Sequence, residues 1–206
     1  MMMTKYPPTG SAAPDAALPP TREFLRHLEE QAIALRRRAA VALLGPLDPW
    51  IVQEQLGCTI VTPEAVAAMT PEVRAQVCRV TPQEWSGTGL PMPDGHLMVL
   101  LNPDQTIERA RVTALEEVAH EHYGHEPTQI ITLPNGVIKR SFNPRNEQEA
   151  YWTAAAALLP MKAVALAVWR GQTAVALAAD YAVSIELAEF RIKILRLWPH
   201  YIRNAA

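Results

Sequence analysis

The stretch LEEVAHEHYGH, Leu115–His125, contains two incomplete copies of one metal-binding helix pattern. In that pattern, H-E-x-x-H, two histidines stand one helical turn apart and bind an ion, and the glutamate after the first acts as a general base. The frame that starts at His120 has Gly124 in the place of the second histidine, and glycine offers no side chain. The frame that starts at Glu116 closes correctly at His120. The second frame is therefore the one that can hold an ion, with glutamate as its first ligand.

A helix over this stretch would place Glu116 and His120 on one face, because residues four apart are neighbours roughly 5–6 Å apart at Cβ. Glu117 would lie about 100° around the helix, where the general base of the motif belongs. Residues 102–104, Asn-Pro-Asp, offer caps for the start of this helix. A glycine follows Tyr123, as is typical of a helix end, so we expect the helix to run to about Tyr123.

A catalytic zinc site usually has three protein ligands, so a third must come from elsewhere in the chain. Glu149, in the stretch NEQEAYWTAAAALLP, is the leading candidate. Glu147 stands two residues earlier and would face another side of that helix, so we expect it to be solvated. His125 could turn back toward the ion past the helix end; the alternative is a histidine that interacts with the helix C-terminus. An isolated E-E-x-x-H is most often a solvated charged face, and it is Glu149 that favours a metal site.

Composition indicates one globular domain with a tail. The 206 residues are 49% hydrophobic and 19% charged, enough for one sizeable core. We predict a disordered, Pro- and Ala-rich tail over residues 1–20 and a single domain over 21–206. A net charge of −2 gives no field that would hold the chain on nucleic acid or an anionic membrane. The two cysteines, Cys58 and Cys78, are expected to be reduced thiols in the cytoplasm.

The patterning predicts an α+β domain that is mainly helical with a small antiparallel sheet. The apolar segment 151–169 is interrupted by Pro160 and Lys162, so we interpret it as two buried helices and not as a membrane span. The run Arg36–Arg38 is expected to be the solvated end of the first helix. Helices are predicted over 21–44, 48–57, 102–123, 146–159, 161–169, 173–181 and 184–197, with short ones starting at 63 and 71. Strands are predicted over 58–61, 84–90, 96–101, 129–133 and 137–142.

Several motifs in this order resemble the ImmA/IrrE family of regulatory metallopeptidases. The family shows a helix ending in H-E-x-x-H and, about thirty residues on, a pattern like E-A-N-x-F-A-A-x-L-L-M-P. Here Glu149–Pro160 reads EAYWTAAAALLP, and DYAVSIELAEFRIKILRL, residues 180–197, is similar to the family's closing segment. Upstream, PLDPWIVQEQLGCTIV, residues 46–61, resembles the opening helix and strand. The resemblance covers Pro46–Leu197 and implies a zincin-like metallopeptidase core.

Residue by residue, the resemblance places the family's second metal histidine on His120, its base on Glu117 and its third ligand on Glu149. Its first histidine falls on Glu116, and this is a departure. A ligand set of Glu, His and Glu cancels the charge of a +2 ion, whereas His, His and Glu leaves one positive charge. Three consequences stay open: slower hydrolysis, a metal such as manganese that favours carboxylates, or loss of catalysis.

The resemblance implies a zinc-dependent endopeptidase that cleaves a regulatory protein such as a transcriptional repressor, in transcription regulation and the stress response. One alternative is a catalytically degenerate module that binds its protein partner without cleaving it. Another is a helix-turn-helix DNA-binding regulator over residues 172–195, whose second helix carries Arg191 and Lys193. Glu186 and Glu189 near the start of that helix would repel phosphate, so we do not expect direct nucleic-acid binding.

Overall fold

The sheet beside the predicted metal-binding helix has three strands in a mixed arrangement. In the computed structural model, β1 (Cys58–Val61) pairs in parallel with β3 (Leu97–Leu101), and β3 pairs antiparallel with β2 (Gly87–Pro91). The predicted antiparallel pairing is therefore right for β2 and β3 and wrong for β1. The chain between β1 and β3 is long enough for the crossover that parallel strands need, and it includes the 3₁₀ turn Pro63–Ala65 and α2 (Pro71–Val77).

The structure describes residues 21–77, 79, 81, 85–126, 129–132, 138–141 and 143–204. The predicted tail over residues 1–20 and Cys78 lie outside this part. Within it, β4 (Gln129–Thr132) and β5 (Ile138–Ser141) form an antiparallel pair. This confirms the pairing expected for the two extended segments that follow the central helix.

Most of the described chain is helical, as predicted. The long central helix ends at Tyr123 as expected, but it begins at Ile107 after a Thr106 cap and not at residues 102–104. The first helix stops at Arg38 instead of near residue 44. The last helix was not predicted as a separate element. Besides α2, the helices are α1 (Arg22–Arg38), α3 (Ile107–Tyr123), α4 (Pro144–Leu158), α5 (Met161–Trp169), α6 (Ala174–Tyr181), α7 (Ile185–Ile194) and α8 (Trp198–Asn204).

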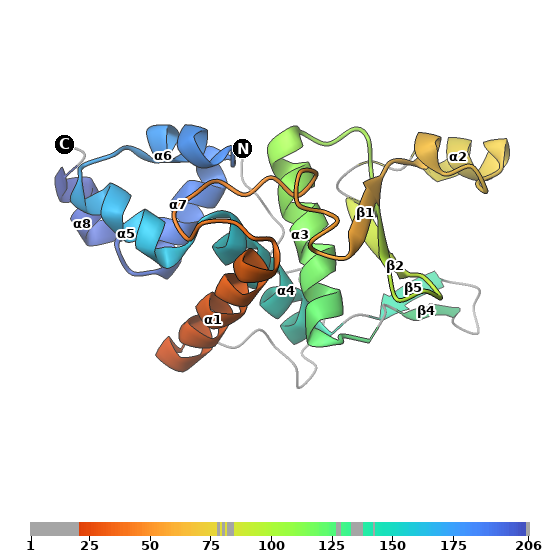
Figure 1. The fold of residues 1–206 in the computed structure, drawn as a ribbon, viewed down its shortest axis with the longest axis horizontal. Helices are drawn as coiled ribbons and strands as arrows, with labels where there is room; N and C mark the ends of the chain where they lie inside the picture. The colour runs from red at the N-terminus through yellow and green to blue at the C-terminus, as the bar shows by residue number, and fades with distance from the viewer. Residues whose placement is uncertain are drawn as a thin grey trace.

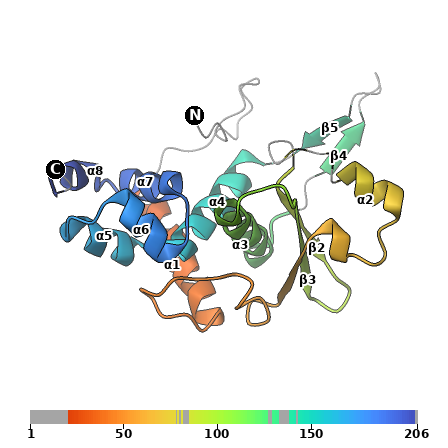
Figure 2. The ribbon, with the colours of Figure 1, turned by 90° about the horizontal axis from the view of Figure 1, so that it is seen from above.

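Helix α3 stands between the sheet and the helices α1 and α4–α8, whereas α2 lies on the sheet side (Figures 1 and 2). It packs against β2 and β3 on one side and against α4 on the other, and α4 also packs against α1. The stretch Ala154–Leu159, at the end of α4, is completely buried, and four of its six residues are alanines. Small side chains let helices approach closely, so the alanine run brings α4 against both α1 and α3.

The predicted helix over residues 48–57 is a series of turns instead. The Asp48 carboxylate accepts from the Trp50 amide at 3.0 Å, and the Gln53 side chain accepts from the Ile60 amide at 2.8 Å. Gly57 ends the segment with a φ of 66°. Side chains that accept hydrogen bonds from nearby backbone amides compete with the hydrogen bonds of a helix. In this segment Asp48 and Gln53 form such bonds, and the chain turns instead of forming a helix.

Arg36 is buried, contrary to the expectation of a solvated helix end. Its guanidinium donates to the carbonyl oxygens of Ala157, Ala42 and Gly45, and the side chain ties α4 and the loop after α1 to the end of α1. Arg37 and Arg38 are exposed as predicted. A sequence pattern shows that a helix ends in arginines, but it does not show which of them meets carbonyl groups from another helix.

No single helix of the described chain is long and apolar enough to cross a membrane. Helices α4 and α5 pass that test of length and composition only as a pair, and they are bent by 54° relative to each other at the break.

Cys58 is expected to react slowly with alkylating agents while the protein is folded. The side chain is 1% exposed, and burial raises the pKa of its thiol to about 11. The thiolate is the reactive form, so at pH of about 8 its population falls by roughly 100-fold relative to an ordinary cysteine. Iodoacetamide labelling of a Cys78→Ser variant, followed by mass spectrometry with and without urea, measures this. Equal labelling rates in the two conditions would contradict the prediction.

Candidate metal centre

The central helix α3 holds two of the predicted site residues in the geometry that the sequence indicates. The helix begins where the Thr106 hydroxyl accepts from the Arg109 amide, and it ends at Gly124, which has a left-handed φ of 64°. Between these caps the helix is regular, so Glu116 and His120 lie one turn apart on the same face. Both side chains are half-buried, at the surface where α3 meets α4.

A third side chain, the carboxylate of Glu147, joins this pair from α4. One ligand atom each from Glu116, His120 and Glu147 lie within 4.8 Å of one another. His120 Nε2 is 3.7 Å from Glu147 Oε1. Ligands bound at about 2.0–2.2 Å to one zinc ion must lie within about 4.4 Å of each other, so small side-chain rotations suffice to close the site. An imidazole and two carboxylates are also suitable ligands for a divalent transition metal, and the residues fit the ion that the motif predicts.

Glu149, the predicted third ligand, lies on another face of α4. Its carboxylate oxygens are 3.2 Å from His125 Nε2 and 3.5 Å from His27 Nε2. The two glutamates are separated by about 200° around the helix, so only one of them can face the Glu116–His120 pair. Glu147, expected from the sequence to be solvated, is the one that does.

His125 turns back toward α3, but it contacts His120 and is not part of the three-residue cluster. Its amide donates to the His120 carbonyl at 3.0 Å in the turn that ends the helix. Its Nδ1 atom is 3.0 Å from Nδ1 of His120, and its side chain is 8% exposed. His125 therefore adjoins the three-residue cluster through His120.

Glu117, the predicted base, faces the sheet beside the cluster. Its Oε2 atom accepts from the Gly89 amide of β2 at 2.8 Å. A Cβ atom on residue 89 would lie 3.2 Å from that same oxygen, so a side chain at this position would crowd the Glu117 carboxylate. Sequence reasoning did not single out Gly89, because its proximity to Glu117 depends on how β2 packs on α3.

The ionisation of the site suits metal binding. Burial, with a smaller contribution from His125, lowers the pKa of His120 to about 4, so its ring is neutral at neutral pH and has a lone pair for a metal. Burial, and then the negative charge of Glu116, raises the pKa of Tyr151 to about 12. Tyr151 therefore stays a neutral phenol near Glu116, and the sequence analysis did not identify it.

Other titratable residues lie away from the cluster. His122 bonds through Nε2 to the Gln31 side chain at 2.9 Å. Glu121 is exposed and 3.8 Å from Arg38. Arg191, proposed as a basic residue of a helix-turn-helix, is only 2% exposed and faces the core. The helix pair α6 and α7 therefore does not present that arginine to a ligand.

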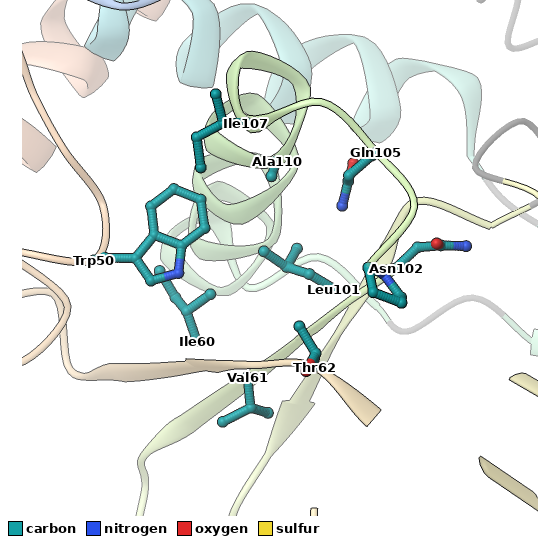
Figure 3. Close-up of a pocket in the computed structure, with 10 residues that line it drawn as sticks. Trp50, Ile60, Val61, Thr62, Leu101, Asn102, Gln105, Ile107 and Ala110 are labelled. Carbon is teal, nitrogen blue, oxygen red and sulfur yellow. The ribbon is translucent and has the colours of Figure 1, made fainter. Parts of the chain in front are cut away.

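Two hollows lie outside the cluster. One, of about 440 Å³, borders Glu149 and is also lined by Phe24, His27 and Arg145. The other, of about 230 Å³, lies where β1 and β3 end (Figure 3). Its lining has no titratable side chain, since uncharged residues such as Trp50 surround it. The hollow where β1 and β3 end therefore offers no acid or base.

Replacing Glu147 by alanine is expected to weaken zinc binding more strongly than replacing Glu149. Glu147 contributes an oxygen to the three-residue cluster, whereas Glu149 contacts His125, which in turn contacts His120 of the cluster. Loss of an outer contact costs roughly 10- to 100-fold in metal affinity, and loss of a direct ligand should cost more. Zinc competition titrations on both variants measure the difference, with the exposed Glu121→Ala as the matched control. Retention of full affinity in Glu147→Ala, with loss in Glu149→Ala, would restore the ligand set expected from the sequence.

Comparison with known proteins identifies the family of the domain that contains this cluster. The profile of the family described as IrrE N-terminal-like domain matches residues 71–193, more than half of the chain. The match lies within the segment 46–197 over which the sequence resembles that family, and it contains the whole cluster. No curated protein gives a significant match.

Among solved structures, a Mycobacterium tuberculosis transcriptional regulator is similar, with a TM-score of 0.47 and 11% sequence identity. The similarity covers 84% of this chain and 47% of the regulator, so the chain corresponds to about half of that protein's length. On the evidence of the profile match, the chain belongs to the ImmA/IrrE family of metallopeptidases.

Proposed function

We propose that this chain is a metal-dependent endopeptidase that acts in the cytoplasm on a regulatory protein, such as a transcriptional repressor. The ion would be held by Glu116, His120 and Glu147, and Glu117 would serve as the general base. The observation that carries the proposal is the convergence of three ligand atoms within 4.8 Å, together with the carboxylate of Glu117, the residue after Glu116, which accepts a hydrogen bond from the Gly89 amide. The protein substrate is inferred from the family, since nothing in the cluster selects one peptide sequence.

The side chains around the cluster have separate tasks in peptide hydrolysis. When bound, a divalent ion supplies Lewis acidity for the scissile carbonyl. Glu117 takes a proton from the attacking water and delivers it to the leaving amine. The Gly89 amide holds that carboxylate in place, and Tyr151 offers a hydroxyl hydrogen near Glu116 because its phenol is neutral.

Zinc is the proposed ion, and manganese is the alternative. The imidazole of His120 suits zinc, whereas two carboxylates with one imidazole also suit the harder manganese ion. The charge of the ligand set bears on activity as well. Two carboxylates neutralise the +2 charge, so the site should polarise a carbonyl less than one with two histidines and one glutamate.

The test is metal-dependent cleavage of candidate repressors. The chain is stripped with a chelator, reloaded with one equivalent of zinc or manganese, and incubated with helix-turn-helix repressors from the source organism and with casein. We expect discrete fragments by mass spectrometry only with metal present, and none from His120→Ala. His122→Ala, two residues away on the same helix and bonded to Gln31, is the control that should stay active. A wild-type chain that takes up no metal would overturn the proposal.

A second candidate is a module that binds the repressor without cleaving it. The presence of Glu116 where the motif has histidine favours it, because the neutral centre is the weaker catalyst. Metal uptake together with stable binding of a repressor, and no fragments, would identify this function. The DNA-binding alternative is weakened by the burial of Arg191.

A further inference from the structure

A line of side chains leads from the metal cluster into the protein and consists of His120, His125 and Glu149. His120 Nδ1 and His125 Nδ1 are 3.0 Å apart, and His125 Nε2 is 3.2 Å from Glu149 Oε2. On the other side of His120, Nε2 faces Glu147 within the cluster. We infer that His125 and Glu149 are positioning residues that hold His120 in the tautomer with hydrogen on Nδ1, leaving Nε2 bare for the ion.

The local fold brings the two imidazoles together. Gly124 adopts the left-handed conformation after α3, and the His125 amide then reaches back to the His120 carbonyl at 3.0 Å. In this type of helix end, the side chains of the two residues joined by that hydrogen bond often meet, usually as an apolar contact. Here the contact is between two imidazoles. The local backbone therefore places the two rings next to each other, with three residues and then a glycine between the two histidines.

The direction of the hydrogen bonds follows from the carboxylate. An ionised carboxylate only accepts hydrogen bonds, so the hydrogen of a neutral His125 must be on Nε2, where it points to Glu149. Nδ1 of His125 is then an acceptor, and the hydrogen between the two rings belongs to Nδ1 of His120. A neutral His120 with its hydrogen on Nδ1 has its lone pair on Nε2. This is the atom that faces Glu147.

Packing holds His125 in this position. Its ring is stacked on Tyr123, with centroids 5.1 Å apart and planes 9° from parallel. The Tyr123 hydroxyl in turn bonds to the Thr153 hydroxyl of α4 at 2.8 Å. The arrangement therefore links the end of α3 to two places on α4, through Thr153 and Glu149.

The expected effect of His125 and Glu149 on metal affinity rests on the proposed function. A ligating histidine whose other nitrogen donates to an acceptor is oriented and made more basic, and such partners contribute about 10- to 100-fold to metal affinity. In this chain the acceptor of His120 is a second histidine, and the carboxylate stands behind it. Glu149 was predicted from the sequence as a ligand. In this arrangement it would affect metal binding indirectly, through the imidazole rings of His125 and His120.

The experiment reads the tautomers directly. Long-range nitrogen–proton NMR spectra of the metal-free full chain at neutral pH distinguish hydrogen on Nδ1 from hydrogen on Nε2 in each of the six histidines. We expect hydrogen on Nδ1 of His120 and on Nε2 of His125. His125→Phe keeps an aromatic ring against Tyr123 but removes the acceptor, so His120 should move toward the Nε2 tautomer. His125→Asn, whose side-chain oxygen takes the place of Nδ1, should restore the Nδ1 tautomer at least in part.

Zinc competition titrations give the second readout. His125→Phe is expected to weaken zinc binding about 10- to 100-fold, whereas the control His122→Phe, bonded to Gln31, should change it less than about threefold. Hydrogen on Nε2 of His120 in the wild-type chain, or on both nitrogens of His125, would overturn the inference. So would an unchanged tautomer and affinity in His125→Phe. The predicted tautomers in a chain that binds no zinc would support the inference while the proposed function failed, so the two failures are distinguishable.

Discussion

Glu117→Gln is expected to reduce the rate of repressor cleavage by about 100- to 10,000-fold while zinc affinity stays within about threefold of the wild type. Glutamine has the same shape as glutamate but cannot take a proton from water. Its side-chain oxygen can still accept the Gly89 amide, which donates to Glu117 Oε2 at 2.8 Å, so the contact between α3 and β2 should persist. The rate is measured with zinc-loaded protein and a repressor that the wild type cleaves.

Glu121→Gln is the matched control, because Glu121 lies one turn further along α3, is exposed, and faces Arg38 at 3.8 Å. It should leave the cleavage rate within about twofold of the wild type, as expected for loss of an exposed ion pair. If Glu117→Gln cleaved as fast as the wild type, Glu117 would not be the base. If Glu117→Gln lost zinc binding as well as activity, the Glu117 carboxylate would contribute to metal binding and would not be shown to act as the general base.

Arg191→Met is expected to lower the free energy of unfolding by about 3–5 kcal/mol. The Arg191 guanidinium pairs with the Glu29 carboxylate and donates through Nε to the Leu159 carbonyl at 3.0 Å. Glu29 also accepts from the Met161 amide at 3.0 Å, at the start of α5, where Pro160 provides no side-chain cap. Removing the arginine would leave a buried carboxylate without its cation, which is the costly way to break such a pair.

Urea denaturation of Arg191→Met measures this loss, and two further variants define its cause. Lys193→Met, on the same helix, removes an exposed pair with Glu189 and should cost less than about 1 kcal/mol. Glu29→Gln combined with Arg191→Met removes the buried charge but keeps an acceptor for the Met161 amide, so it should be more stable than Arg191→Met alone. A loss below about 1 kcal/mol for Arg191→Met would show that the buried pair is not important for stability.

Local signals in the sequence were sufficient for the part of the site that lies on one helix. The spacing of Glu116 and His120 and the glycine after Tyr123 predicted a helix with both side chains on one face, and the structure has that helix. These signals act over a single turn, so they do not depend on what packs against the helix. The family resemblance, which depends on the order of such local motifs, is confirmed by the profile match over residues 71–193.

The choice between Glu147 and Glu149 could not be made in the same way. Both are acidic residues near the start of α4, and the sequence gives no direct measure of how that helix is rotated against α3. The rotation follows from the packing of buried alanines between α1, α3 and α4. The packing turns Glu147 toward Glu116 and His120, and Glu149 toward His125 and His27.

Local signals in the sequence predicted most of the helices, the end of α3 at Gly124, and the position of Glu116 and His120 on one helical face, and they left open whether His125 turns back toward α3. The tertiary structure decided the third member of the cluster, the parallel pairing of β1, and the burial of Arg36 and Arg191. The difference comes from the sequence separation over which each interaction acts. Capping and helical periodicity act between residues a few positions apart, whereas side chains some tens of residues or more apart meet only when whole elements pack.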